Sequence, residues 1–158
     1  MSDDLSHKQE VNAIYDRGNY AEIFERDLIE ADQEIIIASP SLRYRKVERI
    51  LSLLKPRQES GVKITIITLF PDSSRFDNAE DISYILSRIR SAGIEVALTE
   101  SESEHFAVID RKLVWHGGVN LLGKEDAWDN LIRIESVKAA AELVEMTHEE
   151  SQNSTSGQ

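Results

Sequence analysis

The apolar residues of this chain follow two alternating patterns over its first hundred positions. Short apolar segments at 34–38, 62–68 and 94–98 predict strands. Before and between them, apolar residues recur at helical spacing in three groups: Tyr20, Ile23, Phe24, Leu28 and Ala31, then Val47, Ile50, Leu51 and Leu54, then Ile82, Ile85, Leu86 and Ile89. Helices that alternate with strands in this order predict parallel strands joined by crossover helices.

Local signals indicate where the predicted helices begin and end. Asn19 followed by Glu22 has the spacing of a capping box and predicts the start of the first helix. Pro56 is expected to kink or end the second helix, because proline lacks the amide hydrogen that a helix interior needs. Gly93 is well placed to end the third helix in a left-handed conformation.

The second half of the chain has a different pattern. Residues 104–109 and 112–116 predict two strands joined by a tight turn at Asp110 and Arg111, which makes the strands antiparallel neighbours. A further strand at 131–134 and a closing helix at 137–146 follow. The whole pattern predicts an α/β fold with a mixed, mostly parallel sheet flanked by helices.

Length and composition limit the organisation of the chain. Its 158 residues suit one domain with a sizeable core, which we place at residues 14–148. Residues 1–13 form an N-terminal tail in this interpretation, and the polar segment 149–158 is expected to be a disordered tail. The absence of cysteine excludes disulfides and thiolate metal sites.

Two further features bear on location. The acidic N-terminus lacks the apolar core of a secretory signal, and no apolar run approaches membrane-spanning length. We therefore expect a cytoplasmic protein with no membrane partner.

The net charge of −11 argues against tight, unspecific nucleic-acid binding by the whole surface. The charge is uneven, however, because basic residues gather between residues 41 and 65. The candidate nucleic-acid-binding residues in this segment are Arg43, Arg45, Lys46 and Arg49. A solvated helix face explains them somewhat better than a phosphate-contacting patch, and both interpretations stay open.

The segment from Glu104 to Asp110, followed by Gly117-Gly118-Val119-Asn120, carries the most specific signal. It resembles the histidine–lysine–aspartate motif of the phospholipase D superfamily, H-x-K-x4-D-x6-G-(G/S)-x-N. Asp110, Gly117, Gly118 and Asn120 match four of its defined positions. Ser103 stands where the motif has its nucleophilic histidine, and His105 stands where it has its lysine.

The resemblance extends over about residues 14–146 and is similar to the phospholipase-D-like domains attached to some DNA helicases. It implies a phospholipase-D-like fold. In the family the histidine attacks phosphorus, while lysine and asparagine hold the phosphate oxygens and no metal or other cofactor is needed. Here Asp129 would orient the nucleophile. Because a second motif copy protonates the leaving group, a single motif implies a homodimer.

The two substitutions leave several interpretations open. Ser103 is a poor nucleophile without a base, and His105, two residues along a strand, is rather too far away to serve as one. His105 is a displaced nucleophile if the strand slips by two residues, a phosphate-binding residue in a site that does not cut, or a solvent-facing histidine. Asn120 also suits a turn after two glycines, and Asp110 is a better turn residue than catalyst.

We therefore expect a metal-independent phosphodiesterase, nuclease-like, that acts on or binds nucleic acid with weakened or lost activity. The expected site residues are His105, Asn120 and Asp129, with Ser103 lining the pocket and Asp110, Gly117 and Gly118 as structural motif residues. The alternative is a non-catalytic module for DNA or protein binding or for dimerisation, with a helicase or another DNA-processing protein as partner.

Overall fold

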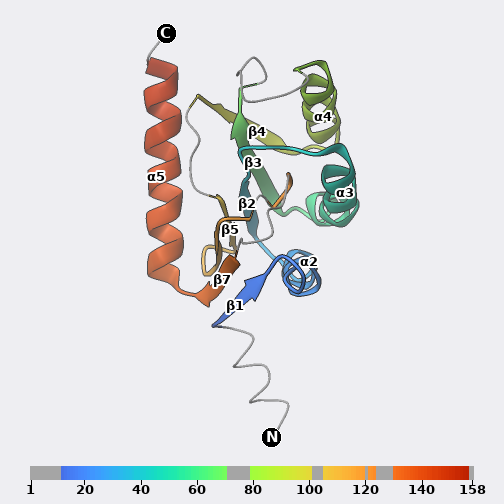
Figure 1. Cartoon of the computed structure of the whole chain (residues 1–158). Coiled ribbons are helices and arrows are strands. Elements are labelled where there is room, and N and C mark those ends of the chain that lie inside the picture. Colours follow the sequence, from blue (N-terminus) through green and yellow to red (C-terminus); the bar gives the residue numbers. More distant parts are fainter. Residues whose placement is uncertain (1–11, 71–78, 101–104, 120, 124–129, 157–158) are drawn as a thin grey trace, which may run out of the picture.

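The computed structural model describes residues 12–70, 79–100, 105–119, 121–123 and 130–156, although not the side chains of 79–81 and 148–156. A seven-stranded sheet runs through the molecule with helices on both of its faces (Figure 1). The strands are β1 (Ala13–Asp16), β2 (Glu34–Ala38), β3 (Lys63–Leu69), β4 (Glu95–Thr99), β5 (His105–Ile109), β6 (Leu113–Gly117) and β7 (Asn130–Glu135). The helices are α2 (Ala21–Ile29), α3 (Tyr44–Glu59), α4 (Ala79–Ser91) and α5 (Val137–Ser156).

The sheet has the order β1-β7-β6-β5-β2-β3-β4. Only the pairs β2–β3 and β3–β4 are parallel, and the other four neighbouring pairs are antiparallel. The predicted mixed α/β class is confirmed, but the prediction of a mostly parallel sheet is wrong. Crossover helices join only β2, β3 and β4. Strand β5 lies antiparallel beside β2, and the tight turn between β5 and β6 makes that pair antiparallel as well.

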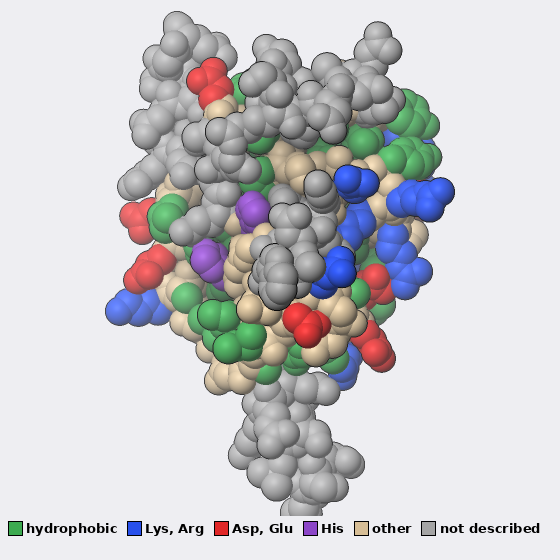
Figure 2. All heavy atoms as spheres, viewed as in Figure 1, with side chains coloured by type: hydrophobic (Ala, Val, Ile, Leu, Met, Phe, Trp, Pro, Cys, Tyr) green, Lys and Arg blue, Asp and Glu red, His purple; other side chains and the backbone are tan. Residues whose placement is uncertain are grey.

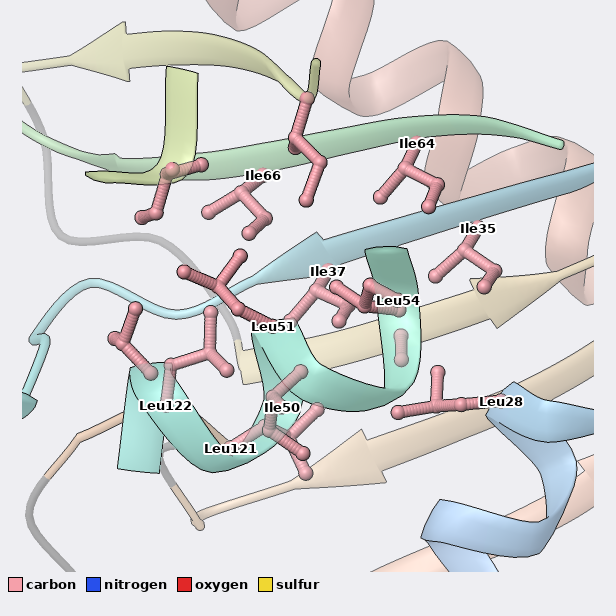
Figure 3. Close-up of a cluster of buried hydrophobic side chains, with 14 of the residues drawn as sticks. Leu28, Ile35, Ile37, Ile50, Leu51, Leu54, Ile64, Ile66, Leu121 and Leu122 are labelled. Atoms are coloured by element: carbon pink, nitrogen blue, oxygen red, sulfur yellow. The ribbon is translucent and has the colours of Figure 1, made fainter. Parts of the chain in front are cut away.

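Two hydrophobic cores enclose the centre of the sheet. Helices α2, α3 and α4 cover one face, where Ile35 and Ile37 of β2 pack with residues such as Leu54 (Figure 3). Helix α5 covers the other face, where Ile36 and Ala38 pack against residues of that helix. Because both faces of β2 are buried, this strand reads as a continuous apolar run rather than an alternating one.

Several predicted boundaries need correction. Asn19 does not cap α2: its Oδ1 accepts a hydrogen bond from the amide of Asp16, and Tyr20 precedes the helix without a side-chain cap. Pro56 lies inside α3, which continues to Glu59. Gly93 has a φ of 82°, as expected for a residue that ends a helix.

Both ends of the described chain hold more regular structure than the pattern indicated. Strand β1 was not predicted, because four residues carry too little periodicity to identify a strand. Helix α5 runs to Ser156, well past the predicted end at Met146. None of the helices in the described part of the chain is long and apolar enough to cross a lipid bilayer.

Candidate functional site

The turn between β5 and β6 is closed by Asp110. Asp110 and Arg111 both have positive φ angles, 55° and 57°, which is the conformation of a tight hairpin turn. The Asp110 carboxylate accepts hydrogen bonds from the amides of Asp32, Gln33 and Glu34 at 3.0, 2.7 and 3.0 Å. The Asp110 carboxylate thus ties the turn to the start of β2. His105 and Gly117 lie at the opposite end of the hairpin.

These contacts change the acidity of Asp110. Partial burial alone would raise the pKa of this carboxyl, but the amide hydrogen bonds from Asp32, Glu34 and Gln33 and the charge of Lys112 outweigh it and lower the pKa. Asp110 therefore holds the hairpin as a carboxylate.

At the other end of the hairpin, the chain leaves β6 through a loop that contains Gly117, Gly118 and Gly123, here called the glycine loop. A Cβ on Gly117 would collide with the carbonyl oxygen of Asn130, so only glycine fits this close approach to β7. The Gly118 amide donates to the same carbonyl at 3.0 Å. Gly123 lies equally close to Ser41 of the β2–α3 loop, and a Cβ there would strike its side chain and carbonyl.

His105 is held by this loop. Its Nδ1 lies 3.0 Å from the carbonyl oxygen of Gly118. A carbonyl only accepts, so Nδ1 carries the hydrogen and Nε2 is left for other chemistry. Within the described residues, Nε2 has no hydrogen-bond partner. The side chain is half-buried, on the sheet face that also carries Ala107 and Ile109.

The start of α3 is bonded to the same loop region. Ser39, at the end of β2, is buried; its Oγ accepts from the Leu122 amide at 3.1 Å and donates to the Ser41 carbonyl at 2.9 Å. The Arg43 amide donates to the Leu122 carbonyl at 2.7 Å. These bonds connect the β2–α3 loop to the chain just after the motif, a contact that sequence reasoning missed.

The four candidate basic residues separate into two pairs. Arg49 forms a fork-like pair with Glu25, at 2.8 and 3.1 Å, and Lys46 Nζ donates to the Tyr20 hydroxyl at 3.0 Å. Arg43 and Arg45 are exposed at the beginning of α3 and form no ion pair within the described part of the chain. Lys and Arg side chains gather on the side of the molecule where α3 and α4 lie (Figure 2).

Ser103, Asn120 and Asp129 lie outside the described residues, so their expected roles beside His105 stay predictions. Among the residues that the structure describes, no three His, Asp or Glu side chains come together as metal ligands. His116 lies on the opposite sheet face from His105, in an apolar groove of about 260 Å³ against α5.

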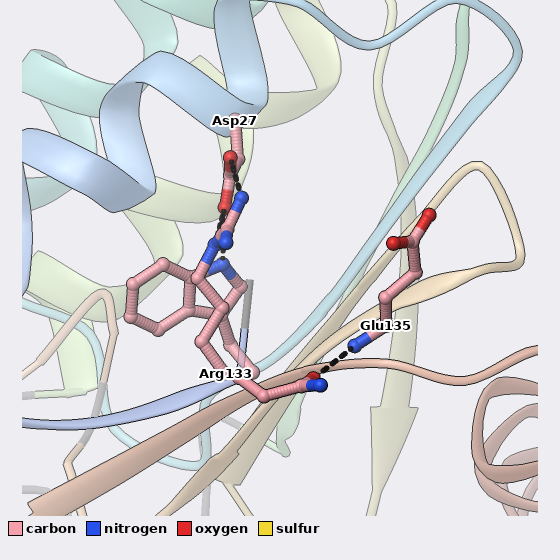
Figure 4. A network of polar contacts seen from close by, with 5 residues as sticks. Asp27, Arg133 and Glu135 are labelled. Carbon is pink, nitrogen blue, oxygen red and sulfur yellow. Dashed lines mark hydrogen bonds and ion pairs between the residues drawn. The ribbon is translucent and has the colours of Figure 1, made fainter. Parts of the chain in front are cut away.

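A buried charge cluster joins helix α2 to strands β6 and β7 (Figure 4). Arg133 of β7 binds both oxygens of Asp27 of α2 at 2.7 Å, and Trp115 Nε1 donates to the same carboxylate at 2.7 Å. This pair joins α2 to β6 and β7, the two strands that carry the glycine loop and the Asn130 carbonyl beneath it. No local sequence signal identifies the pair, because its charged members lie 106 residues apart.

Comparison with known proteins identifies the family. A family model described as "Cardiolipin synthase, PLD-like domain" matches residues 24–149. The chain belongs to the phospholipase-D-like family. A search of curated protein sequences found no match.

Solved structures show the same fold at low identity. Nuc from Salmonella typhimurium, a phospholipase D family member, is 16% identical with a TM-score of 0.70, over 90% of this chain and 95% of Nuc. NucT from Helicobacter pylori is 16% identical with a TM-score of 0.69, over 89% and 95%. TrmBL2, an archaeal chromatin protein, is 15% identical with a TM-score of 0.62, over 88% of this chain and 51% of TrmBL2.

Proposed function

We propose that this phospholipase-D-like chain binds the phosphodiester backbone of nucleic acid beside the loop after β6, and that its hydrolytic activity is weak or lost. The observation that carries the proposal is the anchoring of His105 Nδ1 by the Gly118 carbonyl, which leaves Nε2 without a partner among the residues that the structure describes. Arg43, on the loop bonded to Leu122, supplies positive charge from the neighbouring element.

The chemistry of His105 limits what this site does with a bound diester. In its cationic form the ring donates Nε2–H to a phosphate oxygen, and in its neutral form the Nε2 lone pair is a nucleophile. It cannot perform both tasks at once. Ser103, at the nucleophile position, needs a base. The motif lysine, which would hold the phosphate oxygens beside the nucleophile, is replaced by His105. Binding is therefore favoured over cleavage.

A second copy of the chain would complete the site. Family members with one motif use a homodimer in which each protomer offers its motif to the other, and this chain has one motif. The proposed site therefore lies at the interface of a homodimer. The resemblance alone suggests a helicase or another DNA-processing protein as a further partner.

A non-catalytic DNA-binding module is the second candidate. TrmBL2, whose structure is described as showing a novel mode of DNA binding, shares this fold over 88% of the present chain. The replacement of both reactive motif positions also supports it. The two candidates share the phosphate contacts and differ only in turnover.

Hydrolysis of bis-p-nitrophenyl phosphate in the presence of a chelator separates the candidates. Slow turnover that His105→Ala abolishes, while Lys138→Ala on distant α5 leaves it unchanged, would support a residual enzyme. No turnover above buffer would leave the binding module.

Binding is tested separately with a labelled DNA oligonucleotide across a salt series. We expect affinity to fall steeply with salt and to weaken in the Arg43→Ala/Arg45→Ala variant, whereas the control Lys112→Ala/Lys138→Ala removes equal charge elsewhere without this loss. Equal weakening in both variants would mean that net charge alone governs binding, and the site proposal would fail.

A further inference from the structure

Two exposed tyrosines form a stacked pair beside the proposed phosphate site. Tyr44 opens α3, directly after Arg43, and Tyr84 lies on α4. Their ring centroids are 5.9 Å apart with an interplanar angle of 14°. They nevertheless remain 45% and 55% exposed, so about half of each side chain is open to solvent. Tyrosine in a packing role would be covered more fully.

The acidic group next to this pair, Glu48, already has a cationic partner. Glu48 accepts from Arg88 Nε at 2.9 Å and Arg88 Nη2 at 3.2 Å, and the hydrogen bond to Arg88 lowers the pKa of Glu48. A hydrogen bond to Glu48 raises the pKa of Tyr44, so its hydroxyl stays protonated. The carboxylate is therefore screened from an approaching polyanion, and the Tyr44 ring stays uncharged.

Positive charge flanks the pair on the same surface. Arg43 and Arg45 precede and follow Tyr44 and are exposed, and Lys55 lines the groove between α3 and α4. Figure 2 shows side chains of the hydrophobic class, which includes tyrosine, next to Lys and Arg on the side where α3 and α4 lie. Flat uncharged rings framed by cations match the two parts of a nucleotide, its base and its phosphate.

We propose that Tyr44 and Tyr84 form a base-stacking platform that makes this chain prefer single-stranded over double-stranded nucleic acid. The inference rests on the proposed phosphate site and extends it. The Arg43 amide donates a hydrogen bond to the Leu122 carbonyl in the glycine loop, and Tyr44 is the next residue along the chain. The tyrosine pair therefore begins one residue from a contact with the glycine loop. Paired bases are stacked within a duplex and cannot offer their faces, whereas the bases of a single strand can.

The test compares three labelled ligands of equal length: a single strand, its duplex, and a strand of abasic sites that keeps the sugar–phosphate backbone and lacks the bases. Binding is measured by fluorescence anisotropy with the wild-type chain, Tyr44→Ala/Tyr84→Ala, Tyr44→Phe/Tyr84→Phe and the control Met146→Ala. Met146 is similarly exposed, at 47%, on the opposite side of the sheet. A strand carrying 2-aminopurine reports stacking directly, because its fluorescence is quenched against an aromatic ring.

We expect the alanine variant to bind the single strand about tenfold more weakly. Duplex and abasic binding should be unchanged, which also shows that the variant is folded. The phenylalanine variant and Met146→Ala should retain single-strand binding, and quenching should vanish only in the alanine variant.

Equal binding of single strand and duplex, or single-strand binding that the alanine variant leaves intact, would overturn the platform while the phosphate site stands; the tyrosines would then be a contact between α3 and α4. Failure of all three ligands to bind the wild-type chain would instead overturn the proposed function, and the platform with it.

Discussion

The β5–β6 hairpin has two ends that differ in how completely their polar groups are engaged. At the turn, the Asp110 carboxylate accepts hydrogen bonds from three backbone amides, which stabilise its negative charge. At the open end, His105 is anchored by one nitrogen only, and Nε2 has no partner among the described residues. The motif thus divides into an anchoring half and a reactive half. Only the reactive half departs from the family pattern, at Ser103 and His105.

Restoring the family residues in the reactive half should have the largest effect. The double variant Ser103→His/His105→Lys places the family's nucleophile and lysine on the retained frame. We expect its metal-independent turnover of bis-p-nitrophenyl phosphate to exceed that of the wild-type chain on the order of 10³-fold, because removal of a nucleophile costs at least this much in other enzymes. An inactive but folded double variant would show that the frame itself has lost the active geometry.

Removal of the anchor should affect stability. Asp110→Ala leaves three amides without their acceptor and places alanine at a φ of 55°, so we expect a loss of about 3 kcal/mol in the free energy of unfolding. Asp110→Asn keeps one acceptor oxygen and tolerates this φ, and should lose about 1 kcal/mol. Urea unfolding followed by circular dichroism measures both, and equal losses would contradict the anchoring role.

Gly117 lies at the open end, where its close contact with Asn130 sets the path of the loop that holds His105. Gly117→Ala should cost about 1–3 kcal/mol through the collision with the Asn130 carbonyl. It should also displace the Gly118 carbonyl and change the tautomer of His105, which nitrogen-15 NMR of the imidazole reports. Gly61 has open surroundings, but its φ of 100° would strain an alanine there, so Gly61→Ala is a poor control. Ala92→Gly, in the loop after α4, is the preferable control.

The smallest effect concerns pH. Because the pKa of Asp110 is lowered in the folded chain, its carboxylate stabilises the fold above the unfolded pKa of about 3.9. That contribution disappears as the pH falls through the folded pKa. Unfolding measurements from about pH 7 down to about pH 3 should therefore show a weaker acid-side loss of stability in Asp110→Asn than in the wild-type chain. An identical slope in both would contradict this assignment.

Local pattern was enough to find most elements but not their arrangement. The helical spacing and the apolar runs predicted α2, α3, α4, the first half of α5 and six of the seven strands, because burial of one face or both leaves a period in the sequence. The pairing of β5 with β2 was not predictable, since an apolar strand carries no record of its neighbour. The buried pair of Asp27 and Arg133 was invisible for the same reason.

The candidate site divides in the same way. The spacing from Asp110 to the two glycines pointed to the family, because a turn carboxylate and a glycine-only contact constrain residue type at fixed positions. The sequence by itself thus determined the class of fold, the position of the motif and its two substitutions. The tertiary structure alone decided which His105 nitrogen is engaged, which basic residues are paired, and that Tyr44 meets Tyr84, because these depend on contacts between segments distant in the chain.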